Sequence, residues 1–327
     1  MKWRCLQILF YVFIGFNCTL AHAQSWQDFK IATGPPTSSS YLLGTFLTAS
    51  LSRPLGDRAC EDVGACGVEG LIAVARAKPD YYAALDDLHK GRADMVVITS
   101  NIAWWTFYGL EIFADKQMRD LRLVLPARAR QFHLISRDKK FRSFQDIKHA
   151  SVAAGHAQSS VRHEFYNILE KSKISPDDLD LVALEQGAAI DGLNNGDVDL
   201  AVLFESAPSA LLTDSLDNIK YHFVRMDAKL IRALAAHFPY LNRGRIESGL
   251  YGLDKPVATL GIDLLLIVNK STPNNLVSQI VKSIVRGNSN EWFTLGQINL
   301  AKQFALSKNK YNAIPFHDGV IAGFAVE

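Results

Sequence analysis

Apolar residues along this chain follow two periods, and the elements that they predict alternate between strand and helix. Short apolar runs predict strands at 29–33, 68–75, 95–99, 121–125, 132–137, 151–154, 199–204 and 260–269. Apolar residues three and four positions apart predict helices at 39–51, 81–90, 161–173 and 227–238, and another that opens after Pro273. Strands alternating with helices indicate an α/β fold.

The same layout occurs twice. Gly34 is followed by three residues and then Ser38-Ser39 at a helix start, and Gly155 is followed by three residues and then Ser159-Ser160. Further on, the segment 84–98 is echoed by 189–203. Six pairs in these segments are identical at a constant spacing: Ala84/Ala189, Asp86/Asp191, Leu88/Leu193, Gly91/Gly196, Asp94/Asp199 and Val97/Val202. Two related halves predict a two-lobed α/β molecule that closes on a small ligand.

No long flexible linker separates the halves, which favours short crossovers between lobes. The apolar strand 260–269 is a candidate for the segment that returns to the first lobe. We therefore expect a discontinuous lobe I at 24–137 with 257–327, and a continuous lobe II at 138–256.

The first 23 residues have the features of an export signal. Lys2 and Arg4 precede an apolar stretch at 8–16, and Ala21-His22-Ala23 provides an A-x-A cleavage site. The apolar stretch is too short to cross a bilayer core of about 30 Å. We expect cleavage after Ala23 and export to the periplasm, with an uncleaved membrane anchor as the alternative.

Charge and cysteine content refine this prediction. The chain has 35 Lys+Arg and 33 Asp+Glu, and two of the basic residues lie in the signal, so the mature chain has no net charge. Nothing therefore predicts nucleic acid or an anionic membrane as a partner. Cys60 and Cys66 remain after cleavage and predict a disulfide in an oxidising compartment, with a metal site as the rival interpretation.

The two strand–turn–helix units predict an anion site. Helix starts expose unpaired N–H groups, and the helix dipole favours negative charge there. Polar residues also follow two buried strands, where ligands bind in α/β sheets. The candidate ligand-binding residues are Thr37, Ser38, Ser39, Tyr41, Thr99, Ser100, Asn101, Gln158, Ser159, Ser160, Glu205 and Ser206. The serines could equally be helix caps.

Three other features have two interpretations each. Glu205 could meet a ligand ammonium group, or could be a rim residue paired with a nearby Lys or Arg. Arg162 could bind a ligand carboxylate, or could be a solvated helix residue. The aromatic run at 104–108 could cover the carbon chain of the ligand, or could belong to the core.

The sequence does not favour an enzyme. It contains no G-x-S-x-G, P-loop, G-x-G-x-x-G or H-E-x-x-H motif. His156, His163 and Glu164 lie close in sequence, but no third metal ligand accompanies the two histidines. We expect no catalysis, metal or cofactor.

Several motifs in order resemble the TAXI-type solute receptors of TRAP transporters. They include I-A-T-G at 31–34, L-x-x-G-R-A-D-M at 88–95, G-H-A-Q-S-S-V-R at 155–162, L-N-N-G-D-V-D-L at 193–200, H-F-P-Y at 237–240 and P-F-H-D-G at 315–319. The chain departs from this family at Pro35 and Pro36, which stand where the family has glycines, and in the loop that holds the cysteines.

The resemblance implies a type II periplasmic-binding-protein-like fold with two crossover strands and a ligand cleft between the lobes. It implies a monomer that captures a small organic anion, such as glutamate or a dicarboxylate, for the TRAP-type integral membrane subunits. The alternative is a periplasmic sensor subunit that signals to a membrane receptor kinase.

Overall fold

The computed structural model describes residues 26–36, 38–57, 66–184, 186–209, 211–212, 221–286, 292–306 and 314–324. The predicted signal at 1–23, Thr37 and Cys60 lie outside these residues. The export signal and the Cys60–Cys66 disulfide therefore stay predictions.

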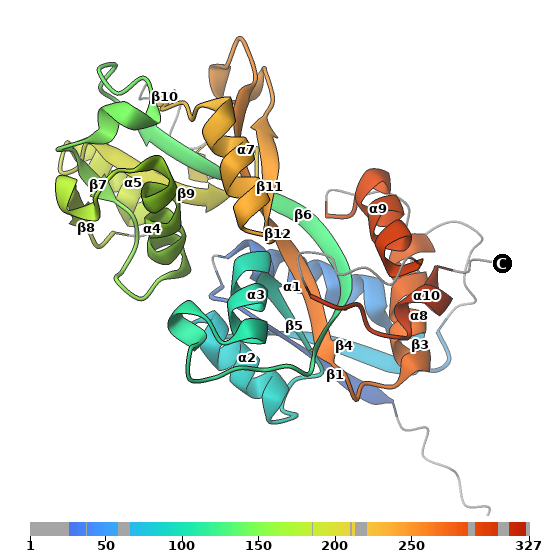
Figure 1. Ribbon diagram of the computed structural model, residues 1–327. Helices are drawn as coiled ribbons and strands as arrows, with labels where there is room; N and C mark the ends of the chain where they lie inside the picture. The colour runs from blue at the N-terminus through green and yellow to red at the C-terminus, as the bar shows by residue number, and fades with distance from the viewer. Residues whose placement is uncertain are drawn as a thin grey trace, which may run out of the picture.

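Two long antiparallel strands, β6 (Leu121–Ser136) and β12 (Val257–Asn269), connect the two lobes (Figure 1). They lie in the middle of a twelve-stranded sheet whose main path is β3-β2-β4-β1-β5-β12-β6-β9-β7-β8. Residues of β12 are buried over almost its whole length, as its apolar sequence predicts for a strand covered on both faces.

Lobe I surrounds one end of these strands. Its strands are β1 (Gln27–Thr33), β2 (Ser52–Arg53), β3 (Val68–Glu69), β4 (Leu71–Ala77) and β5 (Met95–Thr99). Its helices are α1 (Ser39–Leu51), α2 (Tyr81–His89), α3 (Ser100–Tyr108), α8 (Asn274–Arg286), α9 (Leu295–Leu306) and α10 (Val320–Gly323), with a 3-10 turn at Glu111–Phe113. β1 pairs in parallel with β4 and β5.

Lobe II surrounds the other end. Its strands are β7 (Ser151–Ala153), β8 (Asp180–Val182), β9 (Leu200–Glu205), β10 (His222–Phe223) and β11 (Leu241–Ile246). Its helices are α4 (Ser160–Ser172), α5 (Gln186–Asn195) and α7 (Ala228–His237), with 3-10 turns at Phe144–Ile147, Pro176–Asp178 and Leu250–Gly252. The predicted residue boundaries of the lobes stay proposals.

One strand prediction was wrong. The segments 121–125 and 132–137 are not separate strands but parts of β6. Pro126 makes this segment atypical of a continuous strand, because proline cannot donate to a strand ladder. In the structure the pairing of β6 with β12 continues through Pro126, with register shifts at Asp263/Leu264 and Leu266/Ile267 that accommodate the irregularity.

The elements that were not predicted include α3 and β11. Helix α3 is buried on nearly every side, so its sequence lacks the polar face that reveals a helical period. Its Trp105 belongs to a hydrophobic core that also contains Phe165 of α4 and Tyr240 beside β11. Lobe I and lobe II therefore share packed apolar side chains next to the crossover strands.

The sequence repeat is also a structural repeat. In lobe I the Asp94 carboxylate accepts a hydrogen bond of 2.7 Å from the Lys30 N–H of β1. In lobe II the Asp199 carboxylate accepts one of 2.9 Å from the Ser151 N–H of β7. Gly91 and Gly196, at the preceding helix ends, both have positive φ, which glycine adopts without strain. The matched residues thus stabilise the same helix–turn–strand unit in each lobe.

Candidate functional site

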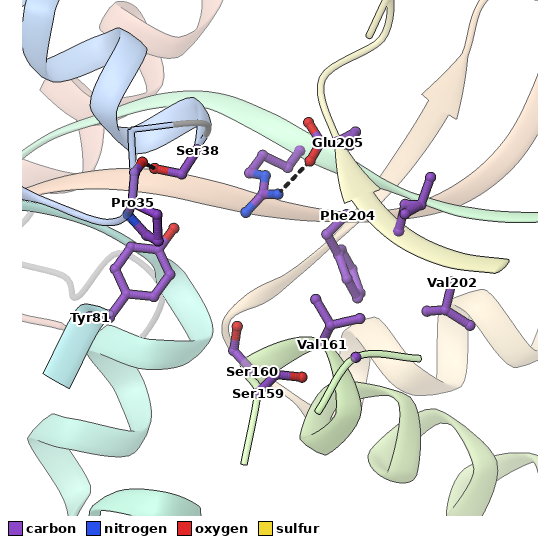
Figure 2. A pocket seen from close by; sticks show the side chains of 12 residues that line it. Pro35, Ser38, Tyr81, Ser159, Ser160, Val161, Val202, Phe204 and Glu205 are labelled. Carbon is purple, nitrogen blue, oxygen red and sulfur yellow. Dashed lines mark hydrogen bonds and ion pairs between the residues drawn. The ribbon is translucent and has the colours of Figure 1, made fainter. Parts of the chain in front are cut away.

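A cavity of about 300 Å³ lies between the lobes, next to β6 (Figure 2). Lobe I contributes Pro35, Ser38 and Tyr81, and lobe II contributes the turn before α4 and the end of β9. The full lining is Pro35, Ser38, Tyr81, Arg130, Gly155, Ser159, Ser160, Val161, Val202, Leu203, Phe204 and Glu205. Residues that are far apart in the sequence thus surround one space, and among them are the predicted site residues Ser38, Ser159, Ser160 and Glu205.

A second, larger cavity of about 730 Å³ shares a wall with the first. Pro35, Tyr81, Ser159 and Ser160 line both. The remaining lining of the larger cavity is Pro79, Asp80, Tyr82, Ile102, Ile112, Phe113, His156 and Gln158. We call the smaller cavity the inner chamber and the larger one the outer chamber.

The start of α1 borders the inner chamber from lobe I. Ser38 caps this helix, because its Oγ accepts a hydrogen bond from the Tyr41 N–H at 3.3 Å. The same hydroxyl donates to the Pro35 carbonyl at 2.6 Å and lies 2.9 Å from the Ser40 Oγ. Ser40 in turn accepts from the Gly34 N–H at 3.0 Å. The hydroxyls of this turn are therefore largely used within the turn itself.

The start of α4 faces it from lobe II. Ser159 caps α4 by accepting from the Arg162 N–H at 3.1 Å. Ser160, the next residue, lines both chambers. Gly155 has a φ of 77°, a left-handed conformation that favours glycine and lets the chain turn from β7 toward the helix.

Arg162 differs from both interpretations of the sequence. It is neither a ligand contact at the cavity lining nor a solvated helix residue, because it is buried. Its guanidinium donates to the carbonyls of Ala154, Gly155 and Val182 at 3.3, 2.7 and 3.0 Å. Helix α4 and the strands β7 and β8 bring these three carbonyls together, so Arg162 positions the turn that carries Ser159 and Ser160.

Arg130, on β6, is the cationic side chain of the inner chamber. It is buried and forms an ion pair with Glu205 of β9, with Nη2 3.0 Å from Oε1. Burial alone would lower the pKa of the Arg130 guanidinium, but the charge of Glu205 and the Tyr81 hydroxyl raise the pKa above its ordinary value. Its buried Nε has no hydrogen-bond partner among the described residues.

Of the two interpretations of Glu205, the ion pair with an arginine is present in the structure. Arg130 is buried and Glu205 is half-buried, and Glu205 also lines the inner chamber. A contact between Glu205 and a ligand ammonium group stays a hypothesis.

The other predicted site residues are dispersed. Gln158 lines the outer chamber. Ser39 is buried beside the cap of α1, and Tyr41 is half-buried one turn into that helix, while Ser206 accepts a hydrogen bond from the Tyr251 hydroxyl. Thr99, Ser100 and Asn101 are buried at the start of α3. Apart from Gln158, none of these residues is among the lining of either chamber, and their role in binding stays a prediction.

The start of α3 lies in a contact between the lobes instead. Ser100 donates to the Tyr240 carbonyl at 2.8 Å, and the Asn101 amide lies 3.4 Å from the Glu164 carboxylate of α4. Burial raises the pKa of Glu164 to about 8, with a further contribution from the charge of Glu111, although the Tyr240 hydroxyl and the Asn101 amide act in the opposite direction. Glu164 is therefore protonated near neutral pH.

The aromatic run of α3 belongs to the same contact. Trp105 and Phe107 are buried in the core, and Trp104 packs against Tyr240 with ring centroids 5.1 Å apart. No residue of the run is among the lining of either chamber. His163 lies 3.3 Å from Glu111, and no group of three or more potential metal ligands converges in the described part of the chain.

Sequence reasoning missed Arg130 and Tyr81. A signal for Arg130 existed, since an arginine within a long, largely buried strand needs an anionic partner or ligand. Treating the segment around it as a break between strands concealed that signal. Tyr81 follows the Asp80 cap of α2, and nothing in its local pattern distinguishes it from a packing residue.

Comparisons with solved structures agree with this fold. A periplasmic sulfonate-binding protein of a putative sulfonate ABC transporter from Methylobacillus flagellatus aligns with a TM-score of 0.50 and 11% identity, over 88% of this chain and 74% of that one. A TctC solute binding protein from Polaromonas aligns with a TM-score of 0.51 and 11% identity, over 79% and 83%. At such identities the similarity concerns the two-lobed fold alone.

No helix in the described ranges has both the length and the apolar character needed to cross a bilayer. The sequence itself matches the NMT1-like family over residues 31–324, which is nearly all of the described chain. The protein belongs to the NMT1-like family, and its fold is that of two-lobed periplasmic binding proteins.

Proposed function

We propose that this protein is an exported solute receptor of the TAXI type, which captures a small organic anion for TRAP-type membrane subunits. The observation that carries the proposal is Arg130. Its guanidinium is buried at the inner chamber between the lobes, and its Nε lacks a partner within the described residues. A buried arginine with an unused donor beside a cavity suits a carboxylate, which accepts charge-assisted hydrogen bonds.

Two further features support an anion at this place. The α4 start presents the Ser160 hydroxyl and the positive end of a thirteen-residue helix to both chambers. The lining also comes from both lobes, so a rotation of the lobes about β6 and β12 would enclose a ligand or release it. In the proposed cycle, the ligand-closed form is the one that the membrane subunits recognise.

The remaining parts of the proposal come from the sequence. We propose cleavage after Ala23, a monomeric mature protein, and lobes bounded at 24–137 with 257–327 and at 138–256. N-terminal sequencing of the exported protein and light scattering of the purified protein test the first two.

A thermal-shift screen with amino acids, monocarboxylates and dicarboxylates tests the function. A ligand at 100 times its Kd stabilises the protein by about 2.7 kcal/mol. We expect Arg130→Gln to weaken binding of the active anion by about 100-fold, because a buried charge-assisted contact is lost. Since this change also removes the partner of Glu205, the double variant Arg130→Gln/Glu205→Gln serves as a control with a neutral pair.

Two results would contradict the proposal. One is a screen in which no organic anion shifts the unfolding temperature, and the other is unchanged affinity in both Arg130 variants. Mass spectrometry after incubation addresses the enzyme alternative, since a receptor returns the ligand unaltered.

A further inference from the structure

The charges around the two chambers restrict the ligand more than the fold does. In the described lining, Arg130 is the one permanent cation, whereas Asp80 and Glu205 are acidic. Asp80 caps α2, where its carboxylate accepts from the Ala83 N–H at 2.7 Å. Glu205 already balances Arg130. A second carboxylate on the ligand would therefore meet acidic groups rather than a second cation, at a cost in Coulomb energy and desolvation.

A lysine that contacts a residue of the outer lining is already engaged in another interaction. Lys116 places its Nζ 3.8 Å from the centre of the Tyr82 ring in a cation–π contact, and Lys116 is not among the lining residues. His156 is part of the outer lining, but an imidazole is not a permanent cation. The outer chamber thus offers no permanent positive charge in its described lining.

The outer chamber instead has an apolar wall. Tyr82 and Phe113 stack with ring centroids 5.8 Å apart, and Ile102 and Ile112 line the same space. At about 730 Å³, this chamber lies in the range of pockets that enclose drug-sized molecules, and it is too large for the second half of a four-carbon diacid to fill. Apolar walls of this kind gain free energy by burying hydrocarbon surface.

The two chambers are adjacent, because Tyr81, Ser159 and Ser160 line both. We infer that the ligand has a single anionic head, which Arg130 holds in the inner chamber, and an uncharged apolar body, which fills the outer chamber. This inference rests on the proposed receptor function and narrows its ligand class. It differs from the dicarboxylate or glutamate that the family resemblance implies.

Four matched probes test the inference by calorimetry on the mature protein. They are 3-phenylpropionate, which has the head and the body, 3-phenylpropan-1-ol, which lacks the anionic head, and succinate and glutamate, which carry a second carboxylate. We expect 3-phenylpropionate to bind at least tenfold more tightly than either diacid, and the alcohol to bind at least tenfold more weakly than 3-phenylpropionate.

A variant pair tests which chamber holds the body. Ile112 is half-buried and lines the outer chamber, so Ile112→Asn should weaken 3-phenylpropionate about tenfold. Ile321 of α10 is 38% exposed and lies outside both linings, so Ile321→Asn should leave the affinity unchanged.

The outcomes separate this inference from the proposed function. If succinate or glutamate binds as tightly as 3-phenylpropionate, and Arg130→Gln abolishes that binding, the protein is a receptor but the single-head inference is overturned. An unchanged affinity in Ile112→Asn would also overturn it. If none of the anions binds, both the inference and the receptor function fail.

Discussion

The starts of α1 and α4 have the same local design but different surroundings. Ser38 and Ser159, which are 121 residues apart, both cap a helix by accepting from the N–H three residues later. One residue further, Ser39 lies outside the lining of both chambers, whereas Ser160 lines both. Ser38 and Ser159 therefore have the same structural role as helix caps. Of the residues that follow them, only Ser160 of lobe II lines the chambers.

The two helices diverge further along. At the third helical position α1 has the half-buried Tyr41, and α4 has the buried Arg162 that holds three carbonyls. Two residues later α1 has Leu43 in an apolar core, and α4 has Glu164 in the contact with α3. Lobe II thus has buried polar groups at positions where lobe I has apolar or aromatic side chains. Through them, the α4 start contacts both the turn beside the cleft and the interface between the lobes.

The largest expected loss of stability comes from removing the Arg162 guanidinium. Arg162→Met retains length and helix propensity but leaves the carbonyls of Ala154, Gly155 and Val182 without this donor. The Val182 carbonyl still accepts from the Ala154 N–H at 3.3 Å, whereas the other two carbonyls lose this donor. Buried unsatisfied groups cost about 1–3 kcal/mol each, so we expect a loss of about 3 kcal/mol in urea unfolding. The matched change Tyr41→Met in α1 should cost less than about 1 kcal/mol. Equal losses in the two variants would mean that the α4 start does not depend on its arginine.

Glu164 makes stability depend on pH. Its pKa is about 8 in the folded protein, compared with 4.5 as its ordinary value. Between these values folding takes up a proton, so stability falls as pH rises from about 4.5 to 8. We expect Glu164→Gln to flatten this dependence and to be more stable than the wild type by about 4 kcal/mol at pH 8, with little difference near pH 4.5.

Urea unfolding across this pH range measures the effect, and the exposed Glu170 of the same helix provides the control. Glu170→Gln should retain the wild-type profile. His133, whose pKa burial lowers to about 4, acts in the opposite direction, since stability falls as pH drops from about 6.5 toward 4. His133 is present in both proteins, so the difference in stability between Glu164→Gln and the wild type reports on Glu164 alone. Parallel stability–pH profiles of the two proteins would contradict the raised pKa of Glu164.

Most of the fold could be predicted because it depends on local pattern. Helix α1 and strand β5 have the predicted bounds, since capping and continuous burial are visible in neighbouring residues. Strand β6 could not be predicted as one element, because its continuity through Pro126 depends on pairing with β12, more than 130 residues later.

The candidate site divides in the same way. The cap roles of Ser38 and Ser159 are properties of a short segment, and they could be predicted. The Arg130–Glu205 pair and the Asn101–Glu164 contact join residues 75 and 63 positions apart. Only the packing of strands and lobes brings those groups together, so the sequence pattern alone did not predict either contact.

Asp94 and Asp199 test whether the repeat is purely structural. Each carboxylate accepts from a strand N–H of its own lobe, so Asp94→Ala and Asp199→Ala should each destabilise the protein by about 1.5 kcal/mol in urea unfolding. The asparagine variants retain an acceptor oxygen and should lose less. Ligand affinity should remain within twofold in all four variants. A larger change in one lobe would show that the matched aspartates have different roles.

The smallest expected effect separates the two helix starts most directly. Ser160→Ala should weaken ligand binding about fivefold, or about 1 kcal/mol, because a hydroxyl that lines both chambers is lost. Stability should barely change. Ser39→Ala, at the equivalent position of α1, should leave affinity unchanged.

The cap residue Ser38 should affect stability instead, with Ser38→Ala costing about 1 kcal/mol in the free energy of unfolding. Calorimetry with the tightest-binding anion, together with urea unfolding, measures both quantities. If Ser39→Ala weakens binding as much as Ser160→Ala does, the ligand is held symmetrically by both lobes, and the distinction between the two helix starts disappears.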